Sequence, residues 1–79
     1  MAVPAADKVV DARGSFCPGP LMELIKAIRD EPVGTVIDVL SSDLGSTKDI
    51  PAWVEKAGHE LLEIKEDQGY WHVLVRKLR

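Results

Sequence analysis

The chain contains one cysteine, Cys17, and this thiol is the one nucleophile in the segment Gly14–Pro20. One cysteine cannot form an internal disulfide, so a disulfide-stabilised scaffold is excluded. A lone thiol in a reducing compartment either packs as a small apolar side chain or carries out chemistry. The residue types alone leave both interpretations open.

Pro18 directly follows Cys17, and Pro18 and Pro20 flank Gly19. A proline biases the preceding residue towards an extended backbone and suits the first helical position itself, so Cys17 is predicted to be the N-cap of a helix. The N-terminal end of a helix carries unpaired N–H groups and about half a positive charge, which favour a thiolate. We therefore expect the pKa of Cys17 to lie below the value of about 8.5 of a free thiol.

Gly19 affects both the hydrogen bonding and the accessibility of the sulfur. Because the two prolines lack an N–H group, Gly19 and Leu21 provide the nearest backbone donors to the expected sulfur position. Gly19 also places no side chain and no charge beside a Cys–S–S⁻ group. A sulfur held in this way can accept a second sulfur and release it to a partner.

The elements that must position Cys17 follow from the spacing of apolar residues. Helical spacing predicts one helix from Pro20 to the stop at Pro32 and Gly34, and a second that starts near Asp49. Pro51 is tolerated only in the first helical turn, which makes Asp49 the predicted N-cap. Short alternating segments predict four strands, at Val9–Ala12, Thr35–Ser41, His59–Asp67 and Tyr70–Leu78, the last two joined at Gln68-Gly69.

The element order is strand, helix, strand, helix, strand, strand. Right-handed crossovers then place both helices on one face of a four-stranded mixed sheet, so the fold class is an α/β (α+β) two-layer sandwich. With 79 residues the chain is expected to be one domain, 1–79. Cys17 then lies at the carboxyl end of the first strand, where α/β sheets usually place their sites.

Other residues of this edge are candidates for supporting roles. The second helix should begin beside Cys17, so Lys48 there and Arg13 in the first loop are candidates to steady a sulfur anion, with solvated surface charges as the alternative reading. Asp49 is expected to be a cap rather than a catalyst. Phe16 is a candidate partner contact, with a place in the core as the alternative.

The two histidines provide no second candidate site. His59 and His72 are far apart in sequence, and neither has an acidic or cysteine residue at a metal-ligand spacing. We therefore expect exposed strand histidines, no bound metal and no organic cofactor.

The charge balance limits the partners. Ten Lys and Arg against 13 Asp and Glu give a formal net charge of −3, which disfavours direct nucleic-acid binding. The segment Met1–Lys8 contains neither a secretory leader nor a membrane span, so the protein is expected to be soluble and cytoplasmic. We also expect it to be a monomer when free.

The segment Cys17-Pro18-Gly19-Pro20 matches the Cys-Pro-x-Pro motif of the TusA/SirA-like sulfur carriers. Nearly the whole chain resembles that family, because Asp11–Gly14, Lys48–Pro51 and the closing Arg76-Lys77 are similar as well. The resemblance departs at two positions: some relatives have a basic residue in place of Phe16, and some have an acidic residue in place of Gly19.

The resemblance implies a role for Cys17. In that family the cysteine receives sulfur as a persulfide from a protein donor, a cysteine desulfurase or another sulfur donor such as a rhodanese-like protein. It passes the sulfur to an acceptor protein in tRNA thiolation, cofactor assembly or sulfur oxidation. By resemblance the chain is a carrier rather than a stand-alone enzyme, with a persulfide or a thiosulfonate as its cargo. The alternative is a regulatory protein-interaction module in which the cysteine is incidental.

Overall fold

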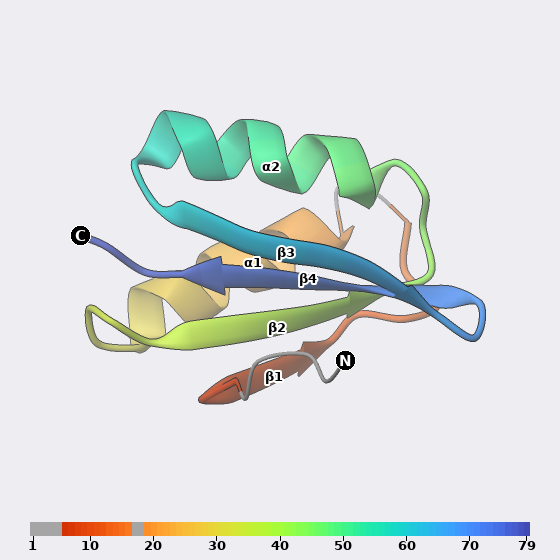
Figure 1. The fold of residues 1–79 in the computed structure, drawn as a ribbon, viewed down its shortest axis with the longest axis horizontal. Coiled ribbons are helices and arrows are strands. Elements are labelled where there is room, and N and C mark those ends of the chain that lie inside the picture. The colour runs from red at the N-terminus through yellow and green to blue at the C-terminus, as the bar shows by residue number, and fades with distance from the viewer. Residues whose placement is uncertain (1–5, 17–18) are drawn as a thin grey trace.

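The computed structural model describes residues 6–16 and 19–79. Its elements follow the predicted order, and their bounds lie close to the predicted ones except at the start of the second helix (Figure 1). They are β1 (Lys8–Asp11), α1 (Gly19–Asp30), β2 (Val36–Ser41), α2 (Ser46–Ala57), β3 (Glu60–Asp67) and β4 (Tyr70–Arg76).

The sheet has the strand order β1-β2-β4-β3. Strand β1 is parallel to β2, and β4 is antiparallel to both β2 and β3, so β1, β2 and β3 all run in the same direction. The connections through α1 and α2 both step across the sheet from the β1 side towards the β3 side. Because such crossovers are right-handed, both helices pack on the same face. The predicted two-layer sandwich with a mixed sheet is confirmed.

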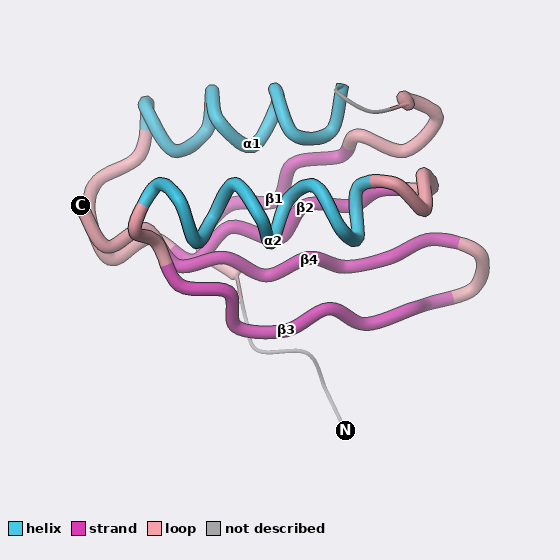
Figure 2. The backbone as a smooth tube through the Cα atoms, turned by 90° about the horizontal axis from the view of Figure 1, so that it is seen from above, coloured by secondary structure: helices cyan, strands magenta, loops and turns pink. Residues whose placement is uncertain are grey.

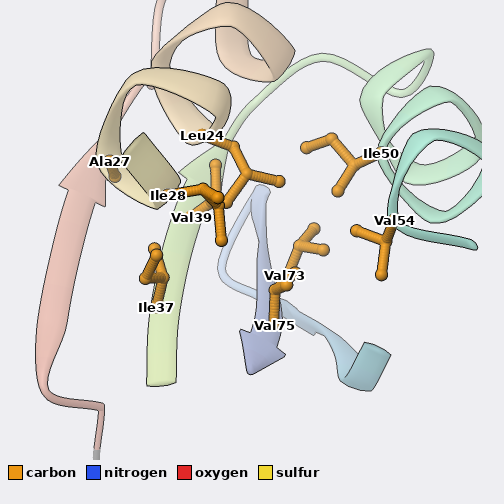
Figure 3. Packing of buried hydrophobic residues seen from close by; sticks show 9 residues of the cluster. All are labelled: Leu24, Ala27, Ile28, Ile37, Val39, Ile50, Val54, Val73 and Val75. Atoms are coloured by element: carbon orange, nitrogen blue, oxygen red, sulfur yellow. The ribbon is translucent and has the colours of Figure 1, made fainter. Parts of the chain in front are cut away.

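The core lies between this face of the sheet and the two helices (Figure 3). Alternate residues of β2 and β4 point into it, as the two-residue period of a strand requires. On the helix side, the residues are spaced three or four apart, and this confirms the predicted helical stripes. The cluster consists of Leu24, Ala27 and Ile28 from α1, Ile37 and Val39 from β2, Ile50 and Val54 from α2, and Val73 and Val75 from β4.

Strands β3 and β4 form a hairpin whose turn is Gln68-Gly69, as predicted. Both turn residues have positive φ, 46° and 93°, which is the conformation of a two-residue turn that matches the twist of the strands. A β-bulge interrupts the pairing between Leu61 and Glu63. Leu62 is the residue inside this bulge, and its side chain is only half-buried.

The start of α2 differs from the prediction. The helix begins at Ser46, so Asp49 lies within its first turn and the prediction of Asp49 as N-cap is wrong. Gly45 occupies the N-cap position in a helical conformation, and the Thr47 N–H donates to the carbonyl of Leu44 at 3.1 Å. These tight turns start the helix early enough for Pro51 to lie inside it, where its missing N–H removes one helical hydrogen bond.

Lys77, directly after β4, joins the sheet to the C-terminal end of α1. Its Nζ donates to the carbonyl oxygens of Ile28 at 2.5 Å and Glu31 at 2.6 Å. The last carbonyls of a helix have no partner within the helix, and a positive charge is favourable beside them. Lys77 therefore satisfies two carbonyls at the end of the helix that begins at the cysteine segment.

We predict that Lys77→Met lowers the free energy of unfolding by about 1–3 kcal/mol, because two partly buried carbonyls lose a charged donor. Urea unfolding followed by circular dichroism measures the change. The matched control is Lys26→Met on the exposed side of α1, which should stay within about 0.5 kcal/mol of the parent chain. Equal unfolding midpoints for the two variants would contradict this role of Lys77.

Candidate functional site

Several loops and both helix starts lie at one edge of the sheet. Because β1, β2 and β3 run in the same direction, their carboxyl ends meet at this edge. Figure 2 shows the β1–α1 loop, the β2–α2 loop, the β3–β4 turn and the starts of both helices at the same end of the molecule. Cys17 and Pro18 lie outside the described residues, so their predicted places as N-cap and first helical residue stay predictions. Their neighbours Phe16 and Gly19 lie at this edge.

Hydrogen bonds fix the segment that leads to the cysteine. The Ala12 N–H donates to the carbonyl of Leu40 at 2.8 Å and so extends the β1–β2 pairing by one residue. Gly14 then turns the chain with a φ of 87°, a backbone conformation that residues with a Cβ rarely adopt. Its N–H donates to the Ser42 Oγ at 2.9 Å. The first loop is thereby tied to the loop that follows β2.

Gly19, the first residue of α1, is hydrogen-bonded to the residue that precedes the cysteine. Its N–H donates to the carbonyl of Phe16 at 2.7 Å, so this predicted donor to the sulfur already has a backbone partner. A Cβ at Gly19 would lie 3.0 Å from the Cβ of Ser15, closer than side chains normally approach. Pro20 behind it is buried against the core. A glycine at this position therefore permits the loop to pack closely against the start of the helix.

Arg13 is held by two neighbours rather than extended into solvent. Its Nε and Nη2 donate to the two carboxylate oxygens of Asp11 at 2.9 and 2.8 Å, and its guanidinium lies 4.8 Å from the centre of the Tyr70 ring. The hydrogen bonds from Arg13 lower the pKa of Asp11 to about 2. The predicted action of Arg13 on a sulfur anion stays a prediction, since its described contacts are with Asp11 and Tyr70.

The predicted residues of the second helix also lie at this edge. Lys48 and Asp49 are exposed in the first turn of α2, at the same end of the molecule as Gly19. The structure therefore brings the starts of the two helices together as predicted. An interaction of Lys48 with a sulfur anion stays a prediction.

Phe16 is exposed, and the alternative that placed it in the core is wrong. Its side chain is 80% exposed at the position directly before the cysteine. Met22 in the first turns of α1 and Leu44 in the β2–α2 loop are also large apolar residues that are mostly exposed. Three apolar side chains therefore lie open to solvent around this edge.

A cluster of polar residues that the spacing of residues in the sequence does not reveal lies on the face of the sheet opposite α1 and α2. His72 was expected to be an exposed histidine, but only 16% of its side chain is exposed. Its Nδ1 lies 2.8 Å from Asp38 Oδ2, and its Nε2 lies 3.3 Å from Asp67 Oδ2. Residues 6–16 and 19–79 contain no group of three or more side chains arranged to hold a metal ion.

One signal in the sequence could have indicated this cluster. Asp38 stands in the middle of the otherwise apolar segment Val36–Leu40, and a buried carboxylate requires a partner. That partner is 34 residues away along the chain. The register of β2 with β4 brings the two together, and the spacing of residues in the sequence does not show this register.

Comparison with known proteins identifies the family. The family model described as "Sulfurtransferase TusA" matches residues 8–77. The chain belongs to the TusA family. It is 62% identical over 71 residues to the "Putative sulfur carrier protein" of Archaeoglobus fulgidus, an alignment that covers 90% of this chain and 97% of the relative.

Two further comparisons agree with this membership. The sulfur carrier protein TusA of Allochromatium vinosum is 38% identical over 71 residues, which cover 90% of this chain and 93% of the relative. The crystal structure of a SirA-like protein from Desulfitobacterium hafniense superimposes with a TM-score of 0.79 and 25% identity, covering 91% of this chain and 99% of that one. The predicted resemblance to the TusA/SirA-like carriers is thereby confirmed.

The TusA-family relatives support the role of a sulfur carrier, which requires protein partners for sulfur transfer. Among the residues that the structure describes, no helix is long and apolar enough to cross a membrane.

The close contact at Gly19 predicts a coupling with Ser15. Gly19→Ala should fail to give the stabilisation of about 1 kcal/mol that alanine usually provides in a helix, because the new Cβ meets the Ser15 Cβ. In the background of Ser15→Gly the same change should stabilise the protein. A double-mutant cycle of urea unfolding measures the difference. Additive effects of the two substitutions would show that this contact is unimportant.

Proposed function

We propose that this TusA-family chain accepts sulfur on Cys17, as a persulfide or a thiosulfonate, and relays it to an acceptor protein. The observation that supports this proposal best is the position of the only thiol in the sequence. The described residues on either side of Cys17 connect the carboxyl end of β1 to the start of α1, at the edge where the loops of the sheet converge.

The proposed step is a thiolate exchange. The Cys17 thiolate attacks the outer sulfur of a donor persulfide, a new S–S bond forms at Cys17, and the S–S bond of the donor breaks. The donor leaves as a thiolate, so the electron pair of the broken bond stays with the donor. The outer sulfur keeps its proton during the exchange. An acceptor thiolate then attacks the outer sulfur of the Cys17 persulfide in the same kind of exchange, and Cys17 leaves as a thiolate.

The start of α1 supports the thiolate form of Cys17 in this proposal. A helix start has a partial positive charge, and the first turn of α1 contains no acidic side chain that would weaken it. Glu23 follows only in the second turn. We assign the ionisation of the thiol to this local field.

The apolar side chains around the edge support a protein as the source and the destination of the sulfur. Phe16, Met22 and Leu44 are large apolar residues that expose more than half of their surface on segments of this edge. Burial of such side chains stabilises protein interfaces. We assign to them the contact with a protein donor, for which a cysteine desulfurase or a rhodanese-like protein is the expected class.

The sulfur-carrier proposal predicts covalent loading at Cys17. Incubation with a cysteine desulfurase and cysteine, or with polysulfide or tetrathionate, should add one or more sulfur atoms or a thiosulfonate group, which intact mass spectrometry detects. A reductant should remove each adduct. Cys17→Ser should stay folded by circular dichroism, because serine is a good N-cap, and should take up nothing.

Two outcomes contradict this prediction. The parent chain could stay unmodified with every donor, or Cys17→Ser could be modified to the same extent. In either case the sulfur-carrier proposal fails, and a regulatory protein-interaction module with an incidental cysteine takes its place.

The proposed docking contact predicts different effects on protein and small-molecule donors. Phe16→Ser should slow the loading of Cys17 from a cysteine desulfurase by about tenfold, the effect of losing about 1.4 kcal/mol of interface energy. Loading from polysulfide should change little. The control is Val33→Ser, because Val33 is 63% exposed but lies in the α1–β2 loop at the opposite end of the sheet. If loading from both donors slowed equally, Phe16 would stabilise the loop rather than contact the donor protein.

A further inference from the structure

The polar cluster opposite the helices is a continuous chain of contacts that leads to the cysteine segment. His72 lies at its centre on β4, between Asp38 on β2 and Asp67 at the end of β3. The side chain of Asp38 is 10% exposed, and its Oδ1 is buried without a hydrogen bond. Among the described contacts, the one with His72 balances the charge of Asp38.

Both ring nitrogens of His72 face a carboxylate oxygen. A neutral imidazole has one N–H and can donate to only one of them, so the observed arrangement suits the imidazolium form. Burial lowers the pKa of His72, but the hydrogen bonds and charges of Asp38 and Asp67 outweigh burial and raise it above 6.5. Lys65 of β3 is the register partner of His72, and Glu63 of β3 and Asp11 of β1 are charged residues on the same face of the sheet.

The contacts continue from Asp67 to Tyr70. The Tyr70 hydroxyl donates to Asp67 Oδ2 at 3.3 Å, and the centres of the Tyr70 and His72 rings are 5.2 Å apart. Burial and the charge of Asp67 raise the pKa of Tyr70, so the hydroxyl keeps its proton at neutral pH. One side chain at the start of β4 therefore contacts both the histidine and its carboxylate partner.

Tyr70 in turn contacts the first loop. The Arg13 guanidinium lies over the Tyr70 ring, and Asp11 holds the same guanidinium from β1. The next residue, Gly14, is tied to Ser42 and leads into the cysteine segment. The hairpin turn, the first loop and the end of β2 are thus linked by side chains at the edge where Cys17 is expected to act.

We propose that Tyr70 is a positioning residue for the first loop, which leads to Cys17 and which Tyr70 holds through Arg13, and that the protonated His72 clamp between Asp38 and Asp67 holds Tyr70 in place. This inference rests on the proposed function, because Cys17 is the group that the loop delivers. When His72 loses its proton, one carboxylate loses its donor. Asp67 is 44% exposed and can turn to solvent, whereas the buried Asp38 cannot. Tyr70 and the first loop are then held less firmly.

The direction of the pH dependence follows from the raised pKa of His72. A group whose pKa is higher in the folded chain contributes its full stabilisation below its unfolded value, here 6.5. The contribution disappears as the pH rises through the folded pKa. The loop should therefore be most ordered below pH 6.5 and should loosen above it.

An NMR titration of the full-length chain tests the inference without any sulfur donor. The backbone amide of Gly14 should shift with the same midpoint as the His72 ring, above pH 6.5. The midpoint of His59 should lie below 6.5, because burial and the charges of Lys77 and Arg79 lower its pKa, so the two histidines can be distinguished. His59→Gln is the matched control and should leave the Gly14 titration unchanged.

Two variants separate positioning from a direct electrostatic effect. His72→Gln should abolish the Gly14 inflection. Tyr70→Leu should keep the His72 titration but remove the inflection at Gly14, because the contact that transmits it is lost. The same variant should remove the His72 inflection from the pH profile of Cys17 alkylation and leave only the inflection of the thiol.

A Gly14 amide that does not follow His72, or that follows it equally in Tyr70→Leu, would overturn the inference. Neither result depends on sulfur uptake, so the proposed function would stand. Conversely, a failure of Cys17 loading with the NMR coupling intact would overturn the proposed function and leave the link between His72 and the loop in place.

Discussion

The packing of two helices on one face of the sheet is the constraint on which the rest of the structure depends. A chain of 79 residues can build one small core, and here it is the layer between α1, α2, β2 and β4. Both crossovers have the same hand and step in the same direction, so both helices cover one face, and because β1 and β2 are parallel, the helices that follow them begin at the same edge. The core that stabilises the fold therefore also determines where the cysteine segment lies.

The edge of the sheet shows how a short loop can be ordered without burial. Its residues Arg13 to Phe16 are exposed, so apolar packing contributes little to their position. Backbone and side-chain hydrogen bonds hold them instead, from Ala12 to β2, from Gly14 to Ser42, and from Gly19 back to Phe16. A loop fixed in this way leaves its surface free for a partner, which suits the proposed relay of sulfur between proteins.

The opposite face of the sheet uses charge where the helix-covered face uses apolar packing. Asp38 and His72 replace the aliphatic residues that a second core would require, and Leu74, the register partner of Asp38, is fully buried beside them. A buried carboxylate is costly unless it is paired, so removal of either partner destabilises more than the pair contributes. This dependence makes His72 sensitive to pH. In our proposal, the contacts of Tyr70 and Arg13 couple the protonation of His72 to the order of the loop that leads to the cysteine.

The sequence was sufficient for the elements, their order and the two-layer arrangement, because apolar periodicity and the handedness of crossovers are local or general properties. It also identified the cysteine segment and the family, since a motif of adjacent residues carries both. The start of α2 was misplaced because Pro51 is tolerated inside the helix once tight turns at Gly45 begin it early. Likewise, the bulge at Leu62 depends on how β3 pairs with β4.

The contacts of His72 could not be predicted from the sequence, because they too depend on how the strands pair. Asp38 and His72 are neighbours only through the register of β2 with β4, and Tyr70 reaches Arg13 only because the hairpin turn and the first loop share one edge. The exposure of Phe16 has the same origin, since a single aromatic residue next to a helix start fits a core or a surface equally well. Periodicity shows which residues are buried along one element. The assembled sheet alone determines which polar side chains meet across it.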